Sequence, residues 1–237
     1  INLNQYLKKK VCEVFFDLKK KNIDIILLTD PREKSQTASF NHFDVYNYIK
    51  QVNPDALVVH RINECDERKN TADVNKQILY ANSFSDFSVF ISTWLYDLFS
   101  NLKRFDESKI ICNGANKSIF FSKFKKHFKN EKFKIVTHHW SNHVNKGFEI
   151  YKLIDQKLSS DKDFNDKIEF TFIGNLPKNY NFTNTNVIKP LRNIELANEI
   201  RKNHAYITGS VNEPGGNHQN EAINCGLPIL YLNSGCM

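Results

Sequence analysis

Residues 213–228 read EPGGNHQNEAINCGLP, and the apolar residues 205–208 shortly before them read AYIT. The apolar run predicts a buried strand, and Pro214-Gly215-Gly216 predicts the turn that follows it. Asn217 has a side chain that can cap a helix, so a helix is expected to begin there and to end at Gly226. A strand, a turn and a helix in this order indicate a βαβ unit of a parallel sheet.

Two carboxylates, Glu213 and Glu221, flank the start of this predicted helix. A helix N-terminus exposes unpaired N–H groups and about half a positive charge, so it favours a phosphate group. Gly215 and Gly216 allow a phosphate to approach the backbone closely. Because a carboxylate only accepts hydrogen bonds, the two Glu side chains suit sugar hydroxyls better than phosphate. The expected ligand carries both phosphates and hydroxyls.

The order Glu, seven residues, Glu, then Ala and Cys-Gly-Leu-Pro resembles the signature of family 4 retaining glycosyltransferases of the GT-B fold, the bacterial group 1 type. The resemblance implies two Rossmann-like doubly wound α/β domains that bind a nucleotide-diphosphate sugar. It implies a catalytic role for Glu213 at the donor-sugar hydroxyls and contact between Glu221 and the ribose hydroxyls. Asn217 and His218 become candidates for direct contact with sugar or phosphate.

The rest of the chain alternates between strand and helix patterns, which is typical of doubly wound domains. In the first half, strands are predicted at residues 24–29, 56–60 and 88–92 and helices at 3–20, 43–52 and 74–82. In the second half, strands are predicted at residues 133–137, 168–173, 186–188, 205–208 and 229–232 and helices at 147–159, 194–203 and 217–225. We therefore expect an acceptor-side domain at residues 1–107 and a nucleotide-sugar domain at residues 108–237.

Both expected domains lack segments that the resembled enzymes have. The sequence opens inside the first predicted helix, with no preceding strand or Gly-rich loop, and it has no initiator Met. It stops at Met237, soon after the last predicted strand. Truncation at both ends is the expectation.

Lys146-Gly147 follows a predicted strand and opens a helix, and it resembles the Lys-Gly that the family uses against the diphosphate. A fixed Lys would stabilise the negative charge that builds on the leaving diphosphate, which makes Lys146 a candidate catalytic residue. The Arg that usually precedes this Lys is absent, since residues 138–143 read HHWSNH. Three histidines in this stretch also raise the alternative of a metal site. The resembled family needs no metal, so no metal ligand is predicted.

Two further segments resemble parts of the family's ligand sites. Gly174-Asn175 follows a predicted strand and resembles the turn that lines the nucleotide pocket. Arg61 lies in the segment VVHRINE of residues 58–64, at the carboxyl end of a strand, where doubly wound sheets bind ligands. Arg61 is a candidate for phosphate or acceptor, and Glu64 or Asp66 for an acceptor hydroxyl. The alternative is a surface ion pair between Arg and Glu.

Composition limits the class of protein further. Hydrophobic residues make up 41% and charged residues 25%, as in ordinary globular proteins. The five cysteines form no C-x-x-C pair, which favours a reducing cytoplasm. The net charge of +7 comes from lysine clusters, which permit contact with the inner face of the membrane but also suit solvated surfaces. A nucleic-acid partner is not expected.

The sequence thus predicts a hexosyltransferase-like, metal-independent enzyme with no cofactor besides its donor. It would transfer sugar, with retention of configuration, to a glycan or lipid-linked acceptor. The alternative is a non-catalytic nucleotide-sugar binding module or an inactive fragment. A dehydrogenase on similar units is disfavoured because no G-x-G-x-x-G follows a predicted strand.

Overall fold

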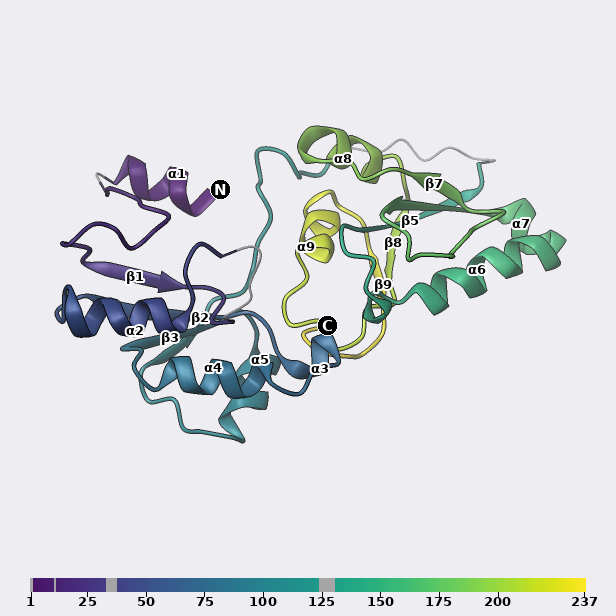
Figure 1. Ribbon diagram of the computed structural model, residues 1–237. Helices are drawn as coiled ribbons and strands as arrows, with labels where there is room; N and C mark the ends of the chain where they lie inside the picture. The colour runs from purple at the N-terminus through teal and green to yellow at the C-terminus, as the bar shows by residue number, and fades with distance from the viewer. Residues whose placement is uncertain (1, 11, 33–37, 124–130) are drawn as a thin grey trace. The chain divides into compact units, whose positions relative to one another are not determined.

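A computed structural model describes residues 2–10, 12–32, 38–123 and 131–237 (Figure 1). The chain divides into two compact units, Ile1–Cys112 and Asn113–Gly235, and the last two residues are shared between them. Each unit is built on its own parallel sheet, as predicted for an α/β protein of two Rossmann-like domains.

The sheet of the first unit has four parallel strands in the order β1-β2-β3-β4. Its strands are β1 (Ile25–Leu28), β2 (Leu57–Ile62), β3 (Phe87–Phe90) and β4 (Ser108–Ile110). Its helices are α1 (Asn2–Lys9), α2 (His42–Gln51), α3 (Asp66–Lys69), α4 (Val74–Asn82) and α5 (Thr93–Ser100). Because all four strands run the same way, their carboxyl ends share one edge of the sheet.

Alternation along β2 decides which of its side chains reach the core of the first unit. Val58, His60 and Ile62 are buried on one face, whereas Val59 and Arg61 on the other face are only partly buried. The buried face packs with Val45 of α2 and Ile78 of α4 in two apolar clusters. His60 is the polar member of that buried row.

The sheet of the second unit has five parallel strands in the order β7-β6-β5-β8-β9. Its strands are β5 (Phe133–His139), β6 (Ile168–Gly174), β7 (Asn186–Ile188), β8 (Ala205–Thr208) and β9 (Ile229–Tyr231). Its helices are the 3₁₀ helix η1 (Val144–Lys146), α6 (Phe148–Ser160), α7 (Lys162–Lys167), α8 (Asn193–Ile200) and α9 (Asn217–Asn224). The strand order reverses between β5 and β8, and doubly wound sheets bind ligands at such a switch point.

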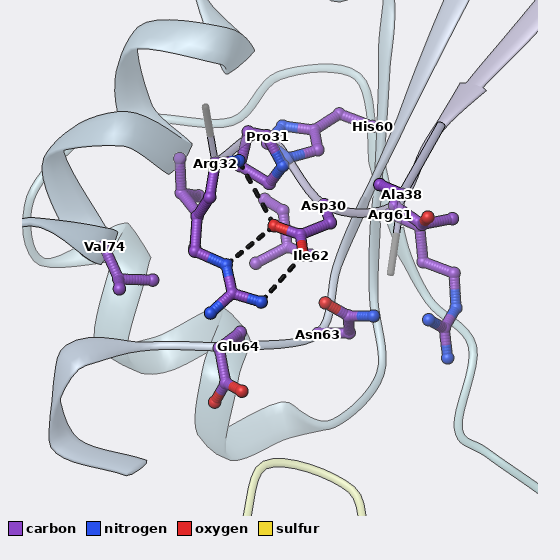
Figure 2. Close-up of a pocket in the computed structure, with 12 residues that line it drawn as sticks. Asp30, Pro31, Arg32, Ala38, His60, Arg61, Ile62, Asn63, Glu64 and Val74 are labelled. Atoms are coloured by element: carbon purple, nitrogen blue, oxygen red, sulfur yellow. Dashed lines mark hydrogen bonds and ion pairs between the residues drawn. The ribbon is translucent and has the colours of Figure 1, made fainter. Parts of the chain in front are cut away.

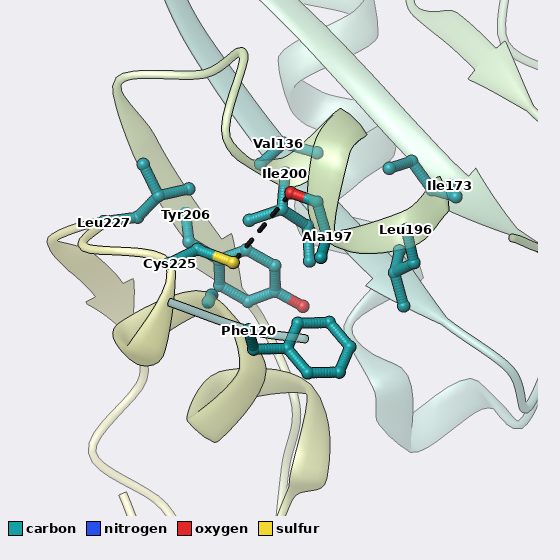
Figure 3. Close-up of a cluster of buried hydrophobic side chains, with 10 residues drawn as sticks. Phe120, Val136, Ile173, Leu196, Ala197, Ile200, Tyr206, Cys225 and Leu227 are labelled. Carbon is teal, nitrogen blue, oxygen red and sulfur yellow. Dashed lines mark hydrogen bonds between the residues drawn. The ribbon is translucent and has the colours of Figure 1, made fainter. Parts of the chain in front are cut away.

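Apolar clusters cover both faces of this second sheet. Figure 3 shows one of them, in which α8 and α9 pack on the sheet through Ala197, Cys225 and Leu227, around the buried ring of Tyr206. The other cluster is aromatic and joins Phe148 and Tyr151 of α6 to the sheet. Burial of the central strands on both faces agrees with the apolar run AYIT of β8.

Three sequence predictions differ from the structure. The helix predicted over residues 3–20 ends at Lys9 in α1, and the residues after it are mostly exposed, Phe16 at 65%. An apolar stripe with nothing packed on it leaves a helix marginal. The border predicted between residues 107 and 108 lies just before β4, and β4 pairs with β3, so the first unit continues to Cys112.

The third difference concerns the start of α9. Gly216 occupies the N-cap position and Asn217 is the first helical residue, so Asn217 is not the cap. Gly226, with φ +83°, follows the helix in the left-handed conformation expected of a terminating glycine.

Within the described ranges, no helix combines the length and the apolar character that a bilayer crossing requires. All five cysteines are free.

Candidate functional site

Two loops meet at the switch point of the second sheet. One follows β5 and leads through η1 into α6, and the other follows β8 and leads into α9. The N–H of Val211 donates to the carbonyl of Asn145 at 2.8 Å. Gly147, with φ +85°, lies so near that a Cβ on it would be 2.3 Å from the carbonyl carbon of Gly209. The two glycines allow the loops to touch backbone to backbone.

Lys146 and Glu213 form an ion pair across these loops. Nζ of Lys146 donates to Oε2 of Glu213 at 2.6 Å, and the two side chains are only 10% and 7% exposed. Taking charges out of water is costly, and pairing compensates much of that cost. The predicted catalytic residues are therefore brought together, and Lys146 already has a carboxylate partner.

Glu221 lies inside α9 and pairs with the end of β5. Nε2 of His138 and Oε2 of Glu221 are 2.8 Å apart. The backbone N–H of His138 donates to the Tyr206 hydroxyl at 3.1 Å, which holds the end of the strand in place. Burial raises the pKa of Tyr206, so this hydroxyl stays neutral. No simple sequence pattern signals the pair of His138 and Glu221.

Two buried histidines lie between the pairs. The rings of His139 and His218 have centroids 4.8 Å apart. Nε2 of His139 lies 2.7 Å from the Tyr151 hydroxyl, and Nε2 of His218 lies 3.2 Å from Oγ1 of Thr208. Burial raises the pKa of Tyr151 to about 12, so this hydroxyl also remains protonated. Both rings are buried in the second unit.

The histidines of residues 138–143 do not converge on one point. His143 lies outside the buried cluster, where its Nδ1 accepts from the N–H of Asn145 at 3.2 Å and caps η1. In the described part of the chain, no three His, Cys, Asp or Glu side chains are grouped so as to hold a metal ion.

The glycines and polar residues before and in α9 have distinct positions. Gly215 accepts at its carbonyl from Nδ2 of Asn113 at 2.7 Å. A Cβ on Gly216 would lie 2.6 Å from the His218 ring, so a larger residue would displace that ring. Asn217 is exposed and His218 is buried, so of these two predicted contact residues only Asn217 has its side chain in solvent.

Gly174 and Asn175 lie at the same carboxyl edge of the second sheet, after β6. Gly174 has φ +148°, and a Cβ there would be 2.0 Å from the carbonyl oxygen of His139. Nδ2 of Asn175 donates to the carbonyl of Trp140 at 2.7 Å. The Arg192 guanidinium lies 4.4 Å from the centroid of the Trp140 ring, which is 60% exposed. No sequence pattern signals the contact of Trp140 with Arg192, since a lone aromatic and a lone Arg carry no motif.

Arg61 lies in the first unit, on β2, among residues that line a pocket (Figure 2). The Asn63 side chain is oriented so that its amide nitrogen donates to the carbonyl of Thr29 at 3.1 Å. Its amide oxygen then accepts from Nη1 of Arg61 at 2.8 Å. Glu64 pairs with Lys69 at 3.3 Å. Burial lowers the pKa of Arg61, although the group remains charged in the physiological range.

Asp66, the other predicted acceptor residue, has a structural role. Its carboxylate accepts from the N–H groups of Val74 and Asn75 and from the Thr71 hydroxyl, which fixes the start of α4. These hydrogen bonds lower the pKa of Asp66, although desolvation, the largest single effect, opposes them.

Solved glycosyltransferase structures are similar to this chain. Sucrose-phosphate synthase from Thermosynechococcus elongatus aligns with a TM-score of 0.66 over 90% of this chain and 56% of that one, at 11% identity. The pneumococcal O-GlcNAc transferase GtfA, in complex with UDP and GlcNAc, aligns with a TM-score of 0.62 over 98% and 44%, at 13% identity. WaaG, a glycosyltransferase involved in lipopolysaccharide biosynthesis, aligns with a TM-score of 0.58 over 84% and 67%, at 12% identity.

These similarities show that the chain has the GT-B fold of glycosyltransferases. The chain spans 56% and 44% of the first two solved chains, which is about half their length. No protein-family model matches the sequence. No curated protein matches it.

Proposed function

We propose that the chain is part of a retaining glycosyltransferase that transfers a sugar from a nucleotide-diphosphate donor to a glycan or lipid-linked acceptor. The observation that carries the proposal is the buried pair of Lys146 and Glu213 at the switch point of the second sheet, just before α9. This pair sets one cation and one hydrogen-bond acceptor beside a helix N-terminus. A phosphorylated sugar needs both.

The diphosphate of the donor is assigned to Lys146 and the start of α9. The N–H groups around Gly216 and Asn217 and the helix dipole favour an anion there. When the bond between the sugar and the diphosphate breaks, negative charge builds on the leaving oxygen, and a fixed ammonium stabilises that charge. Glu213 holds Lys146 in place before the donor binds, so the cation needs little reorganisation.

The hydroxyls of the donor are assigned to the two carboxylates. Each carboxylate has about four acceptor sites, so Glu213 can accept from sugar hydroxyls while it holds Lys146. Glu221 is likewise assigned to the ribose hydroxyls, with His138 orienting it. Support comes from the fold neighbours, since GtfA is in complex with UDP and GlcNAc and an E. coli trehalose-6-phosphate structure is bound with UDP-2-fluoro glucose.

In this proposal the bond from the sugar to the diphosphate breaks through an oxocarbenium-like state. The acceptor hydroxyl then adds to the sugar, and its proton passes to the leaving diphosphate. Lys146 and the helix dipole supply the positive charge, and the proposal invokes no metal ion or further cofactor. We place the protein in the cytoplasm, where its lysine clusters favour contact with the anionic inner face of the membrane.

Two measurements on the chain test the proposal. A thermal-shift screen with UDP, GDP and their sugars is expected to find at least one stabilising donor. Incubation with that donor is then expected to release free nucleotide diphosphate. Binding without release would favour the alternative of a non-catalytic nucleotide-sugar module. A screen in which no nucleotide or nucleotide sugar raises the melting temperature would contradict both.

A further inference from the structure

The segment of residues 209–216 links β8 to α9 and carries Glu213, the acidic half of the buried ion pair (Figure 1). The segment belongs to no helix or strand, so the hydrogen bonds of regular structure do not fix its backbone. A functional side chain on such a segment is held precisely only if other residues hold the backbone on either side of it. The contacts of the segment therefore show which residues position Glu213.

Ser234, in the segment that follows β9, holds the residue that precedes Glu213. Oγ of Ser234 accepts from the backbone N–H of Asn212 at 2.9 Å and donates to Oδ1 of Asn212 at 3.4 Å. Asn212 has φ +50°, a left-handed conformation that is unfavourable for a residue with a side chain. The Ser234 hydroxyl therefore stabilises a strained backbone directly before Glu213.

Gly235 lies against the peptide of Glu213 itself. A Cβ on Gly235 would be 2.4 Å from the backbone nitrogen of Glu213 and 2.5 Å from its carbonyl oxygen. Gly235 also has φ +69°, which favours glycine. Because the two backbones approach so closely, the Glu213 peptide has no room to move toward the segment that follows β9.

Asn113 holds the residue two positions beyond Glu213. Nδ2 of Asn113 donates to the carbonyl of Gly215 at 2.7 Å, and the carbonyl of Asn113 accepts from Nδ2 of Asn220 in α9 at 2.9 Å. Between these fixed points lies Pro214, whose ring fixes its own φ and disfavours a helical backbone at Glu213. The backbone on both sides of Glu213 is thus bonded to residues outside the segment.

The ion pair leaves little tolerance for movement of Glu213. Nζ of Lys146 and Oε2 of Glu213 are 2.6 Å apart, and both side chains are buried. The backbone that carries Lys146 is fixed separately, because the carbonyl of Asn145 accepts from the N–H of Val211 at 2.8 Å. A displacement of the Glu213 carboxylate by about 1 Å would stretch its contact with Lys146 beyond the length of a hydrogen bond.

We propose that Ser234 and Asn113 are positioning residues that preorganise the ion pair of Glu213 and Lys146. Ser234 acts through the N–H of the residue before Glu213, and Asn113 acts through the carbonyl of Gly215. The positioning is a property of the chain without ligand, and only its consequence for donor binding rests on the proposed function. A preformed site spends no binding free energy on ordering itself, so loss of either residue is expected to weaken donor binding.

The ammonium of Lys146 reports the positioning directly, without any ligand. A buried, hydrogen-bonded ammonium exchanges its protons slowly, so NMR of the chain with isotope-labelled lysine is expected to show a Lys146 signal that is absent from Lys146→Met. In Ser234→Ala and in Asn113→Ala the exchange rate is expected to rise about tenfold, the change that corresponds to losing one hydrogen bond. An unchanged rate in either variant would overturn the assignment of that residue.

A double-mutant cycle gives a second measure that a purely structural role would not change. Lys146→Met leaves the Glu213 carboxylate buried without its cation, and a loosened segment lets that carboxylate reach water. In the Ser234→Ala background, the effect of Lys146→Met on the unfolding equilibrium constant is therefore expected to be about tenfold smaller than in the wild type. Additive losses in urea unfolding would show that Ser234 stabilises the unit without positioning Glu213.

Two further asparagine variants separate positioning from general loosening of the second unit. Asn116→Ala is the matched control, since Oδ1 of Asn116 accepts from the N–H of Ser118 at 3.0 Å and the variant removes that hydrogen bond from the same stretch of chain. It is expected to leave the Lys146 exchange rate unchanged. Asn113→Asp keeps the shape but replaces the donor by an acceptor, and it is expected to raise the rate at least as much as Asn113→Ala. Equal rates in Asn113→Ala and Asn116→Ala would contradict the proposal.

Titration with UDP-glucose tests the consequence for the donor. Ser234→Ala is expected to weaken its affinity about tenfold, in parallel with the faster exchange at Lys146. Equal affinity in the wild type and in Ser234→Ala would contradict that consequence. If no nucleotide sugar binds the wild type, the proposed function fails, whereas the exchange rates and the double-mutant cycle still decide whether Ser234 and Asn113 position the ion pair.

Discussion

The Glu221 carboxylate lies 2.8 Å from Nε2 of His138, although the two residues are 83 positions apart in the chain. His138 is the penultimate residue of β5 and Glu221 lies in α9, so the contact joins the central strand of the second sheet to the helix that follows β8. His138 is nearly buried and Glu221 is partly exposed, which leaves part of the carboxylate accessible to a ligand. The histidine therefore acts as a positioning residue for Glu221.

Glu221→Gln is expected to weaken affinity for a free nucleotide diphosphate by about tenfold, because an amide is a weaker acceptor for ribose hydroxyls than a carboxylate. His138→Gln is expected to weaken that affinity less, since His138 acts on the ligand only through Glu221. Isothermal titration of both single variants and the double variant measures the coupling. Additive losses would show that His138 does not position Glu221.

Lys146→Met is expected to destabilise the second unit by about 3–5 kcal/mol, because it leaves the Glu213 carboxylate buried without its cation. Lys146→Met combined with Glu213→Gln is expected to recover most of that stability, since neither charge then remains. Urea unfolding of the three proteins measures these differences. A single variant as stable as the wild type would show that the pair is not desolvated in solution.

A second variant of Lys146 tests its role in turnover. If the ammonium acts on the leaving diphosphate, Lys146→Arg in a full-length active enzyme lowers kcat more than it lowers donor affinity. The Arg variant keeps the charge and the pair with Glu213 but moves the cation. Equal losses in kcat and in affinity would assign Lys146 to donor binding alone.

The strands were predicted well because burial of a parallel sheet favours strongly apolar strands, such as AYIT at residues 205–208 and IEFTFI at residues 168–173. The strand β4 was missed because its three residues, SKI, contain a single apolar side chain and so form no apolar run. The long first helix was overpredicted because apolar spacing alone does not show whether a core lies beneath it. Local sequence patterns thus predicted the elements that are buried in the core, and failed for those that are mostly exposed.

The candidate site was predicted only in part, for a different reason. Glycine turns and carboxylates at a helix start are local features, and they pointed to Glu213 and Gly216, whereas Lys146 was predicted from the family resemblance. The partners are not local: Lys146 and Glu213 are 67 residues apart.

Gly147→Ala is expected to destabilise the second unit by about 1–3 kcal/mol or more, because φ is +85° there and a Cβ would collide with Gly209. Gly114→Ala is the matched control, since nothing lies within 4 Å of a Cβ at that position and its φ is not in the left-handed region. Thermal unfolding of both variants gives the comparison. Equal stability of the two would mean that the loops after β5 and β8 do not touch as described.

Trp140→Ala is expected to weaken binding of a nucleotide diphosphate but not of inorganic pyrophosphate. Trp140 is exposed at the carboxyl edge of the second sheet with Arg192 over its ring, and an aromatic ring contributes about 1–3 kcal/mol when a base stacks on it. Titration with UDP and with pyrophosphate separates the base from the phosphates. A parallel loss for both ligands would argue against stacking.

His60 makes stability depend on pH in a definite direction. Its pKa is about 3 in the folded chain, below the ordinary value of 6.5, so between those values the unfolded state binds a proton that the folded state does not. The stability associated with its neutral form is present above pH 6.5 and is lost as the pH falls toward 3, by up to about 1.4 kcal/mol per pH unit. Asp66 and Asp155 act in the same direction: desolvation opposes the shift, but hydrogen bonds lower the pKa of both, so the stability that these two carboxylates contribute is also lost as the pH falls. Comparing wild type with His60→Leu therefore isolates the contribution of the histidine to this pH dependence. In urea unfolding from pH 7 to pH 4, the free energy of unfolding of the variant is expected to fall less steeply than that of the wild type. Identical slopes would show that His60 is protonated or hydrated in the folded chain.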